Sequence, residues 1–134
     1  MPLASVTRLR IRSIRFLPAF FLYAVRSMRE ARAAQGVLGA EVFNDAALTF
    51  WTCSVWEDQR AMRAYMTSGV HSQAMKRLAH WCDEASVVHW EQDSRELPSR
   101  DIAWQHMQGD GRPSRVHHPS AAHQVFRIAP LRKS

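Results

Sequence analysis

The chain has 134 residues, of which 46% are hydrophobic, and this is enough for one compact domain and too few for two ordinary ones. Its two cysteines, Cys53 and Cys82, lack the spacing of a zinc site or a redox pair, so we expect reduced thiols in a cytoplasmic protein. The net charge of +6 is concentrated in residues 1–35 and 94–134, and such basic ends bind acidic partners or simply keep a protein soluble. The apolar run 17–25 is too short to span a bilayer, so we expect no membrane contact.

The first predicted elements are a strand and a helix. Polar and apolar residues alternate over residues 7–14, which is typical of a half-buried strand. Apolar residues then recur at helical spacing and predict a helix over residues 18–34. Pro18 suits the first turn of that helix, and Gly36 lies where a glycine can end it.

A hairpin is predicted next. Residues 37–43 and 48–56 are rich in β-branched and aromatic side chains, which favour strands. Asn44 and Asp45 lie between the two runs, and this pair favours a tight turn.

Two helical segments and a last strand complete the pattern. Asp58 can cap a short helix, Ser68-Gly69 interrupts it, and helical spacing resumes over residues 70–81. Residues 85–91 are predicted to form the last strand. The order is therefore β-α-β-β-α-β, which is the α+β arrangement of ferredoxin-like folds.

The composition changes after Asp93. The residues that follow predict a short helix ending near Gln108 and then an extended or disordered basic tail. Few regularly spaced apolar residues occur in 121–134, so we expect this part to be dispensable for folding. We therefore divide the chain into a ferredoxin-like domain, residues 1–93, and a C-terminal extension, residues 94–134.

One block of sequence resembles known families. It consists of a strand that ends in tryptophan, a helix, an interruption and a second helix, and its residues are Trp51 to Trp56, Glu57-Asp58, Met62, Tyr65-Met66, Ser68-Gly69, His71, Ala74-Met75 and Trp81. The chain resembles DUF3291, a family of uncharacterised domains. It is more distantly similar to the antibiotic-biosynthesis-monooxygenase-like members of the dimeric α/β barrel superfamily. The likeness extends over residues 6–120.

The resemblance implies a four-stranded antiparallel sheet with helices on one face, two subunits paired sheet to sheet as a dimeric α/β barrel, and a pocket between sheet and helices. It does not imply one reaction, because the superfamily contains cofactor-free oxygenases, haem-dependent enzymes and proteins without known activity. The expected cofactor is therefore none or haem. The haem-degrading branch has a tryptophan and a histidine where this chain has Tyr65 and Met75, so that pattern is broken here.

His71 is the first candidate for a catalytic residue. On a helical projection it shares the apolar arc with Ala74 and Leu78, so its side chain should point inward. In the structural interpretation it is a core histidine with a hydrogen-bond partner; in the functional interpretation it is a general acid or base, or an axial haem ligand. The resemblance adds Tyr65, in the position of the branch's tryptophan, as a second catalytic candidate.

Large aromatic side chains are numerous for so small a core. Trp51 and Trp56 either pack in the core and the dimer interface or form flat walls for a planar ligand. Met75, in the position of the haem-degrading branch's histidine, is assigned to the same pocket. We predict that these three side chains bind an apolar or aromatic small molecule.

His89 and Arg10 have two interpretations each. His89, in the last predicted strand, contacts either a ligand or the partner subunit. Arg10 shares one face of the first strand with two other arginines, and it either pairs with acidic residues on neighbouring strands or holds a carboxylate of a ligand. His117 and His118 point apart in an extended segment and have no third ligand, so we expect no metal site.

The predicted function is that of a small monooxygenase-like protein, a cofactor-free or haem-dependent oxygenase that binds an apolar or aromatic molecule between sheet and helices. The alternative is a non-catalytic ligand-binding or structural homodimer of the same fold. A third hypothesis is a basic adaptor whose tail contacts an acidic partner. The interleaved aromatic residues of an RNA-stacking sheet are absent from the sequence, so we expect no nucleic acid to bind.

Overall fold

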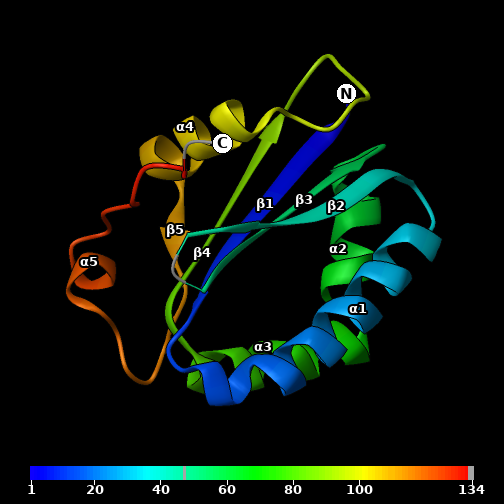
Figure 1. Ribbon diagram of the computed structural model, residues 1–134. Helices are drawn as coiled ribbons and strands as arrows, with labels where there is room; N and C mark the ends of the chain where they lie inside the picture. Colours follow the sequence, from blue (N-terminus) through cyan, green and yellow to red (C-terminus); the bar gives the residue numbers. More distant parts are fainter. Residues whose placement is uncertain (47, 133–134) are drawn as a thin grey trace.

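A five-stranded antiparallel sheet forms the centre of the computed structural model, which describes residues 1–46 and 48–132, without the side chains of 69–72 and 74 (Figure 1). The strands are β1 (Leu3–Ile11), β2 (Val37–Asp45), β3 (Thr49–Trp56), β4 (Cys82–Glu91) and β5 (Arg112–Pro113). Their order across the sheet is β2-β3-β1-β4-β5. β1 lies between β3 and β4 and pairs with both, so the N-terminal strand is the central one.

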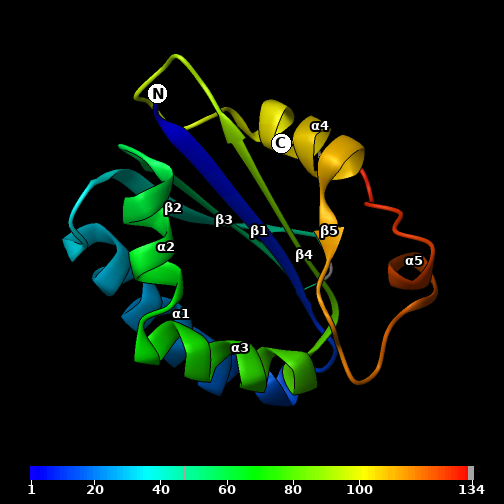
Figure 2. The same cartoon turned by 180° about the vertical axis from the view of Figure 1, so that it is seen from behind.

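Helices cover both faces of this sheet. One face, which we call the helix face, lies against α1 (Leu17–Ala33), α2 (Gln59–Met66) and α3 (Gly69–Trp81) (Figure 2). The other, which we call the extension face, lies against α4 (Arg100–Asp110) and α5 (Ala121–Gln124). The predicted ferredoxin-like α+β order is confirmed. The sheet has five strands rather than four, because the C-terminal extension adds the two-residue β5 beside β4.

The first strand begins earlier than the alternation predicts. It covers Leu3–Ile11 instead of residues 7–14, and its first four residues are all buried. A central strand that is covered on both faces buries consecutive residues, so its start carries no alternating pattern. At its other end, Ser13 accepts a hydrogen bond from the Arg15 backbone N–H (3.4 Å) and begins the short 3₁₀ helix η1 (Ile14–Phe16) that leads into α1.

Two sequence signals place the helices as predicted. The Asp58 side chain accepts a hydrogen bond from the Ala61 backbone N–H (2.8 Å), so it caps α2. Gly36 follows α1 with a φ of +86°, a conformation that side chains other than glycine rarely adopt. A Cβ at this position would also lie 2.5 Å from the Ala61 Cβ, so the turn between α1 and β2 packs closely on α2.

The extension face is apolar and buried by the chain itself. Ala103 and Met107 of α4, both fully buried, pack against Val6, Trp51 and Val88 of the three central strands. Trp51 stacks on a neighbouring phenylalanine of β2, with ring centroids 5.9 Å apart. The resemblance predicts that this face is open and meets a second subunit; instead, the C-terminal extension covers it.

The last part of the chain also packs on the domain, which corrects the prediction of a disordered tail. Ile128 is buried in the same cluster as α4, and Phe126 and Leu131 pack against that cluster. The indole N–H of Trp104 donates to the Ala129 carbonyl oxygen (2.8 Å). The sequence gives little indication of this packing, because the apolar residues of this part of the chain are few and lie among polar ones.

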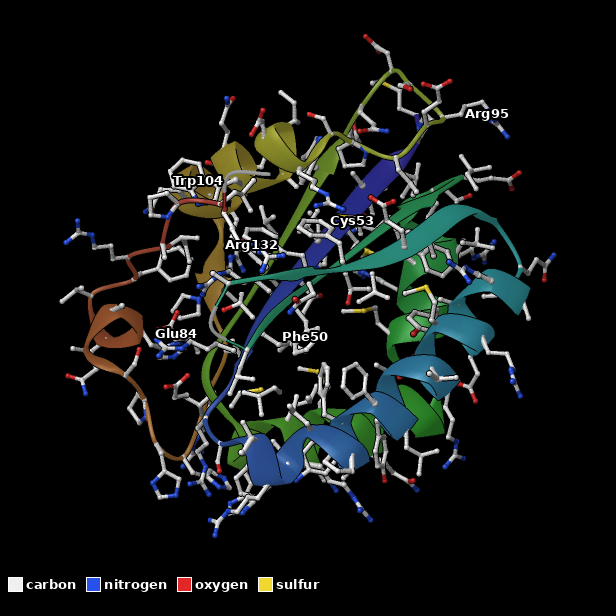
Figure 3. All side chains as sticks on the ribbon, viewed as in Figure 1. Phe50, Cys53, Glu84, Arg95, Trp104 and Arg132 are labelled. Carbon is white, nitrogen blue, oxygen red and sulfur yellow. The ribbon has the colours of Figure 1, made fainter. Side chains whose placement is uncertain are left out.

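A charged cluster lies on the extension face beside this apolar region. Glu84 of β4 is nearly fully buried, and its carboxylate accepts hydrogen bonds from Arg8 (2.7 Å) and Arg10 (2.9 Å) of β1 and from the Ser120 hydroxyl (2.8 Å). Figure 3 shows Glu84 on the side of the sheet that faces α5. Burial alone would raise the pKa of Glu84, but these hydrogen bonds from arginine and serine more than offset it and lower the pKa below its ordinary value.

The outer edge of the sheet at β2 is protected by a side chain of α1. The Arg32 guanidinium donates two hydrogen bonds, of 3.2 and 3.1 Å, to the carbonyl oxygen of Ala40 in β2. An edge strand otherwise presents such carbonyls to solvent.

Candidate functional site

A cavity of about 140 Å³ lies between the helix face and helices α1–α3. Most of its walls are apolar: Leu9 and Ala85 come from the sheet, and Phe20, Met28 and Leu78 come from the helices. Among the described lining residues, Arg115 of the C-terminal extension carries the one charge, and none carries a carboxylate. The cavity therefore suits a small apolar ligand that is neutral or negatively charged.

The floor of the cavity carries a row of hydroxyl groups. Ser5 and Thr7 of β1 pair with Ser54 and Thr52 of β3, so the four side chains lie side by side on the helix face. Within the described part of the chain the Thr7 and Thr52 hydroxyls make no hydrogen bond, and both threonines are only partly buried. These two hydroxyls can therefore donate to, or accept from, a polar group of a bound molecule.

The other two hydroxyls of the floor are held by their neighbours. The Ser54 hydroxyl accepts a hydrogen bond from the Trp56 indole N–H (2.8 Å), and the Ser5 hydroxyl lies 3.1 Å from Nδ1 of His89. Partial burial of the imidazole, followed by the charge of Arg112, lowers the pKa of His89. His89 is thus neutral at neutral pH and orients Ser5 from the end of the hydroxyl row.

Trp56 and Tyr65 form a flat aromatic wall of the cavity. Their rings stack with centroids 5.3 Å apart and an interplanar angle of 28°. The Tyr65 hydroxyl donates to the Ser27 carbonyl oxygen of α1 (3.0 Å), which fixes the ring. Burial, followed by the nearby charge of Glu30, raises the pKa of Tyr65, so the phenol stays protonated and does not serve as a base.

An open groove of about 590 Å³ lies between α1 and β2, beside the cavity. Both hollows are lined by Ala24 and Met28 of α1 and by Val42 of β2, so they adjoin each other. Phe21 and Val25, on the outer side of α1, are half exposed along the groove.

The structure brings three of the predicted site residues together. Trp56, Tyr65 and Met75 all line the cavity, Met75 from α3. His71 also belongs to α3, but its side chain lies outside the described residues.

Two predicted ligand-binding residues lie elsewhere. Trp51 is on the extension face under α4, because it is five positions from Trp56 in the same strand and therefore points to the opposite side of the sheet. Arg10 is also on that side, where it pairs with Glu84 (2.9 Å) and Asp83 (3.8 Å). The pairing with acidic residues was one of its two interpretations. His89 contacts the floor only through Ser5.

The hydroxyl row is the part of the site that the sequence analysis missed. Its signal is present as serine and threonine at alternate positions of both strands, Ser5 and Thr7 in β1 and Thr52 and Ser54 in β3. Hydroxyl residues in strands are ordinary, so the pattern becomes informative only when pairing brings the four together.

A haem does not fit this cavity. Its volume, about 140 Å³, is close to that of a protein cavity that holds one benzene molecule, and a porphyrin is several-fold larger. Iron in a haem commonly takes a histidine ligand; no described histidine lines the cavity, and the side chain of His71 lies outside the described residues. Elsewhere in the described residues, no group of three histidine, cysteine, aspartate or glutamate side chains is placed to hold a metal ion. No helix among them is long and apolar enough to cross a membrane.

Comparison with known proteins agrees with this fold. Residues 19–77, from α1 into α3, match the family model of antibiotic biosynthesis monooxygenase. The fold is similar to that of Rv0793 from Mycobacterium tuberculosis, with a TM-score of 0.64 and 12% identity over 70% of this chain and 97% of that one. A conserved protein from Methanosarcina mazei gives 0.62 and 11% identity over 69% and 94% of the two chains.

A third solved structure, that of an antibiotic biosynthesis monooxygenase, gives a TM-score of 0.61 and 15% identity over 69% of this chain and 99% of that one. At these identities the likeness establishes the fold. The neighbours are matched over nearly their whole length, yet about 30% of this chain has no counterpart in them. No similar protein was found among the curated proteins.

Proposed function

We propose that this protein binds a small phenolic molecule in the cavity above the hydroxyl row and oxidises it with molecular oxygen, without haem or metal. The observation that carries the proposal is the floor of the cavity, where the Thr7 and Thr52 hydroxyls face an otherwise apolar space. One aromatic ring fills a volume of about 140 Å³, and a phenolic oxygen can exchange hydrogen bonds with the threonines. The single positive charge at the rim also favours the phenolate form.

The match of residues 19–77 to antibiotic biosynthesis monooxygenase supports an oxygenase reaction. A phenol that reacts with one O₂ can give a quinone and one water. The C–H bond opposite the phenolic oxygen becomes a second C=O, the phenolic O–H becomes the first, and the other oxygen atom leaves as water with the two hydrogens. The substrate supplies all four electrons, so the reaction needs no external reductant.

His71 is the proposed base that removes the phenolic proton, since imidazole titrates near neutral pH. Tyr65 remains a protonated phenol and, with Trp56, positions the substrate ring. His71→Ala should abolish quinone formation, measured by absorbance and by an oxygen electrode. His80→Ala is the matched control, because His80 is exposed on the same helix. Unchanged turnover by His71→Ala would remove this residue from the reaction.

Binding is tested separately from turnover. Titration calorimetry should show that phenol binds about 3- to 10-fold more tightly than benzene, the value of one net hydrogen bond. Thr7→Val with Thr52→Val should remove this difference. Ala24→Phe should fill the cavity and abolish binding of both probes, whereas Ala33→Phe, on the exposed side of α1, should leave binding unchanged. Equal affinities for phenol and benzene in the wild type would refute the role of the hydroxyl row.

A non-catalytic ligand-binding protein is the second candidate. One observation favours it: no described lining residue is a histidine, an aspartate, a glutamate, a lysine or a cysteine, the side chains that commonly serve as general bases. This candidate predicts phenol binding without oxygen consumption. The proposed oxygenase predicts both.

A further inference from the structure

The C-terminal extension makes contacts with each of the four long strands across the extension face. At β2, the Arg100 guanidinium lies 4.2 Å from the centre of the Phe43 ring. At β4, the His106 ring stacks on Trp90 with centroids 3.8 Å apart and an interplanar angle of 1°. Between them, Met107 packs on the central strands β1 and β3. The extension is therefore a continuous cover and not a loosely attached tail.

Polar contacts hold the extension at one end of the sheet, on β2 and on β4. The Arg132 backbone N–H donates to a carboxylate oxygen of Asp45, at the end of β2 (2.8 Å). The Ser120 hydroxyl donates to Glu84 near the start of β4 (2.8 Å). Figure 3 shows Trp104 and Arg132 on this same side of the sheet. Because the carboxylates belong to the sheet and the donors to the extension, each contact exists only when the extension is docked.

The extension face of the sheet would associate with another protein surface if the C-terminal extension did not cover it. Val6, Trp51 and Val88 are between 0% and 4% exposed, and they lie on three adjacent strands. A contiguous apolar sheet face of this kind marks a protein interface in a soluble protein. A second copy of the chain offers an identical face, so a two-fold pairing of sheets is the self-complementary way to cover it.

We propose that the C-terminal extension, residues 94–132, takes the place of a second subunit and keeps the protein monomeric. It occupies, within one chain, the face that the sequence analysis assigned to a partner. The neighbours of similar fold are matched over nearly their whole length while about 30% of this chain stays unmatched, a share as large as the extension, which agrees with an addition to a complete fold. Releasing the extension therefore converts the monomer into a dimer that pairs through the extension face.

The test compares masses in solution for three full-length proteins by sedimentation velocity at micromolar concentration. The wild type should have the monomer mass of 15.4 kDa. Ala103→Glu with Met107→Glu places two charges on the buried side of α4 and should release it, giving about twice that mass. Ile102→Glu with Gln105→Glu adds the same charges to the exposed side of α4 and should leave a monomer.

Circular dichroism checks that each variant retains its helices and strands. A wild type with twice the monomer mass overturns the proposal, whether or not the Ala103 and Met107 variant folds. A folded variant of Ala103 and Met107 that stays monomeric also overturns it, because an uncovered extension face would then have no tendency to pair. A monomeric wild type, a dimeric buried-side variant and a monomeric exposed-side variant together support it.

Discussion

Glu84→Gln tests the charged cluster that joins β1, β4 and the C-terminal extension. In the wild type the Glu84 carboxylate accepts hydrogen bonds from Arg8, Arg10 and Ser120 at 2.7 to 2.9 Å. Glutamine has nearly the same shape, but it carries no charge and turns an amide N–H₂ toward the arginines. Removing one partner of a buried ion pair costs about 3 to 5 kcal/mol, and we expect a value near the lower end because the amide oxygen still accepts one hydrogen bond.

Such a loss is a large part of the stability of a small domain, about 5 to 15 kcal/mol. Urea denaturation followed by circular dichroism should show a much lower midpoint for Glu84→Gln. Glu91→Gln is the matched control, because Glu91 is exposed on the same strand and its change should stay within about 0.5 kcal/mol. A loss below about 1 kcal/mol for Glu84→Gln would refute the structural role of the cluster.

The pH dependence of stability provides a second, independent measurement on Glu84. Its pKa in the folded protein lies below the ordinary value of 4.5, so the unfolded chain binds more protons in the range between the two. The stabilisation is complete above the ordinary pKa and is lost as the pH falls through the folded value. The wild type should therefore lose stability in acid more steeply than Glu84→Gln, and parallel curves for the two proteins would contradict this reasoning.

Three further outcomes are expected. Gly36→Ala should destabilise the protein by about 1 to 3 kcal/mol, because it combines a positive φ with a clash against Ala61; an unchanged urea midpoint would be inconsistent with the turn described. Deletion of residues 121–134 should lower the melting temperature by several degrees, since it removes side chains packed on the extension face. An unaltered melting temperature would instead support the prediction from the sequence that these residues are dispensable for folding. Burial raises the pKa of Cys53 and Cys82 to about 12, so iodoacetamide should label neither thiol at pH 8 until the protein is unfolded; rapid labelling of native protein would show that they are accessible.

The sequence predicted the order of the elements because periodicity and capping are local. Asp58 and the alternating apolar runs are read within a few residues, and they placed the helices and strands of the first domain in the correct order. It was also predictable that Trp51 and Trp56 lie on opposite faces of the sheet. They are separated by an odd number of positions in one strand, so they could not both face the pocket. Alternation does not say which of the two faces the helices cover.

The cover of the extension face was not predictable in the same way. Its contacts join residues far apart in sequence, such as Asp45 with Arg132 and Glu84 with Ser120, and no local pattern encodes such a pair. The hydroxyl row had the same difficulty, since Ser5 and Ser54 become neighbours only through the pairing of β1 with β3. The parts of the site that were predicted, Trp56 and Tyr65, lie within one short stretch of chain.

Each edge of the sheet carries a feature that hinders the addition of a further strand. At β2, Arg32 already holds the carbonyl oxygen of Ala40, so an approaching chain would have to displace two hydrogen bonds to use that acceptor. At the opposite edge, β5 is only two residues long and contains Pro113, which has no N–H to donate. Strand addition, the step by which crowded or partly unfolded proteins grow into fibrils, is therefore hindered at both edges. Concentrated solutions of the folded protein should resist fibril formation, whatever happens on the two faces of the sheet.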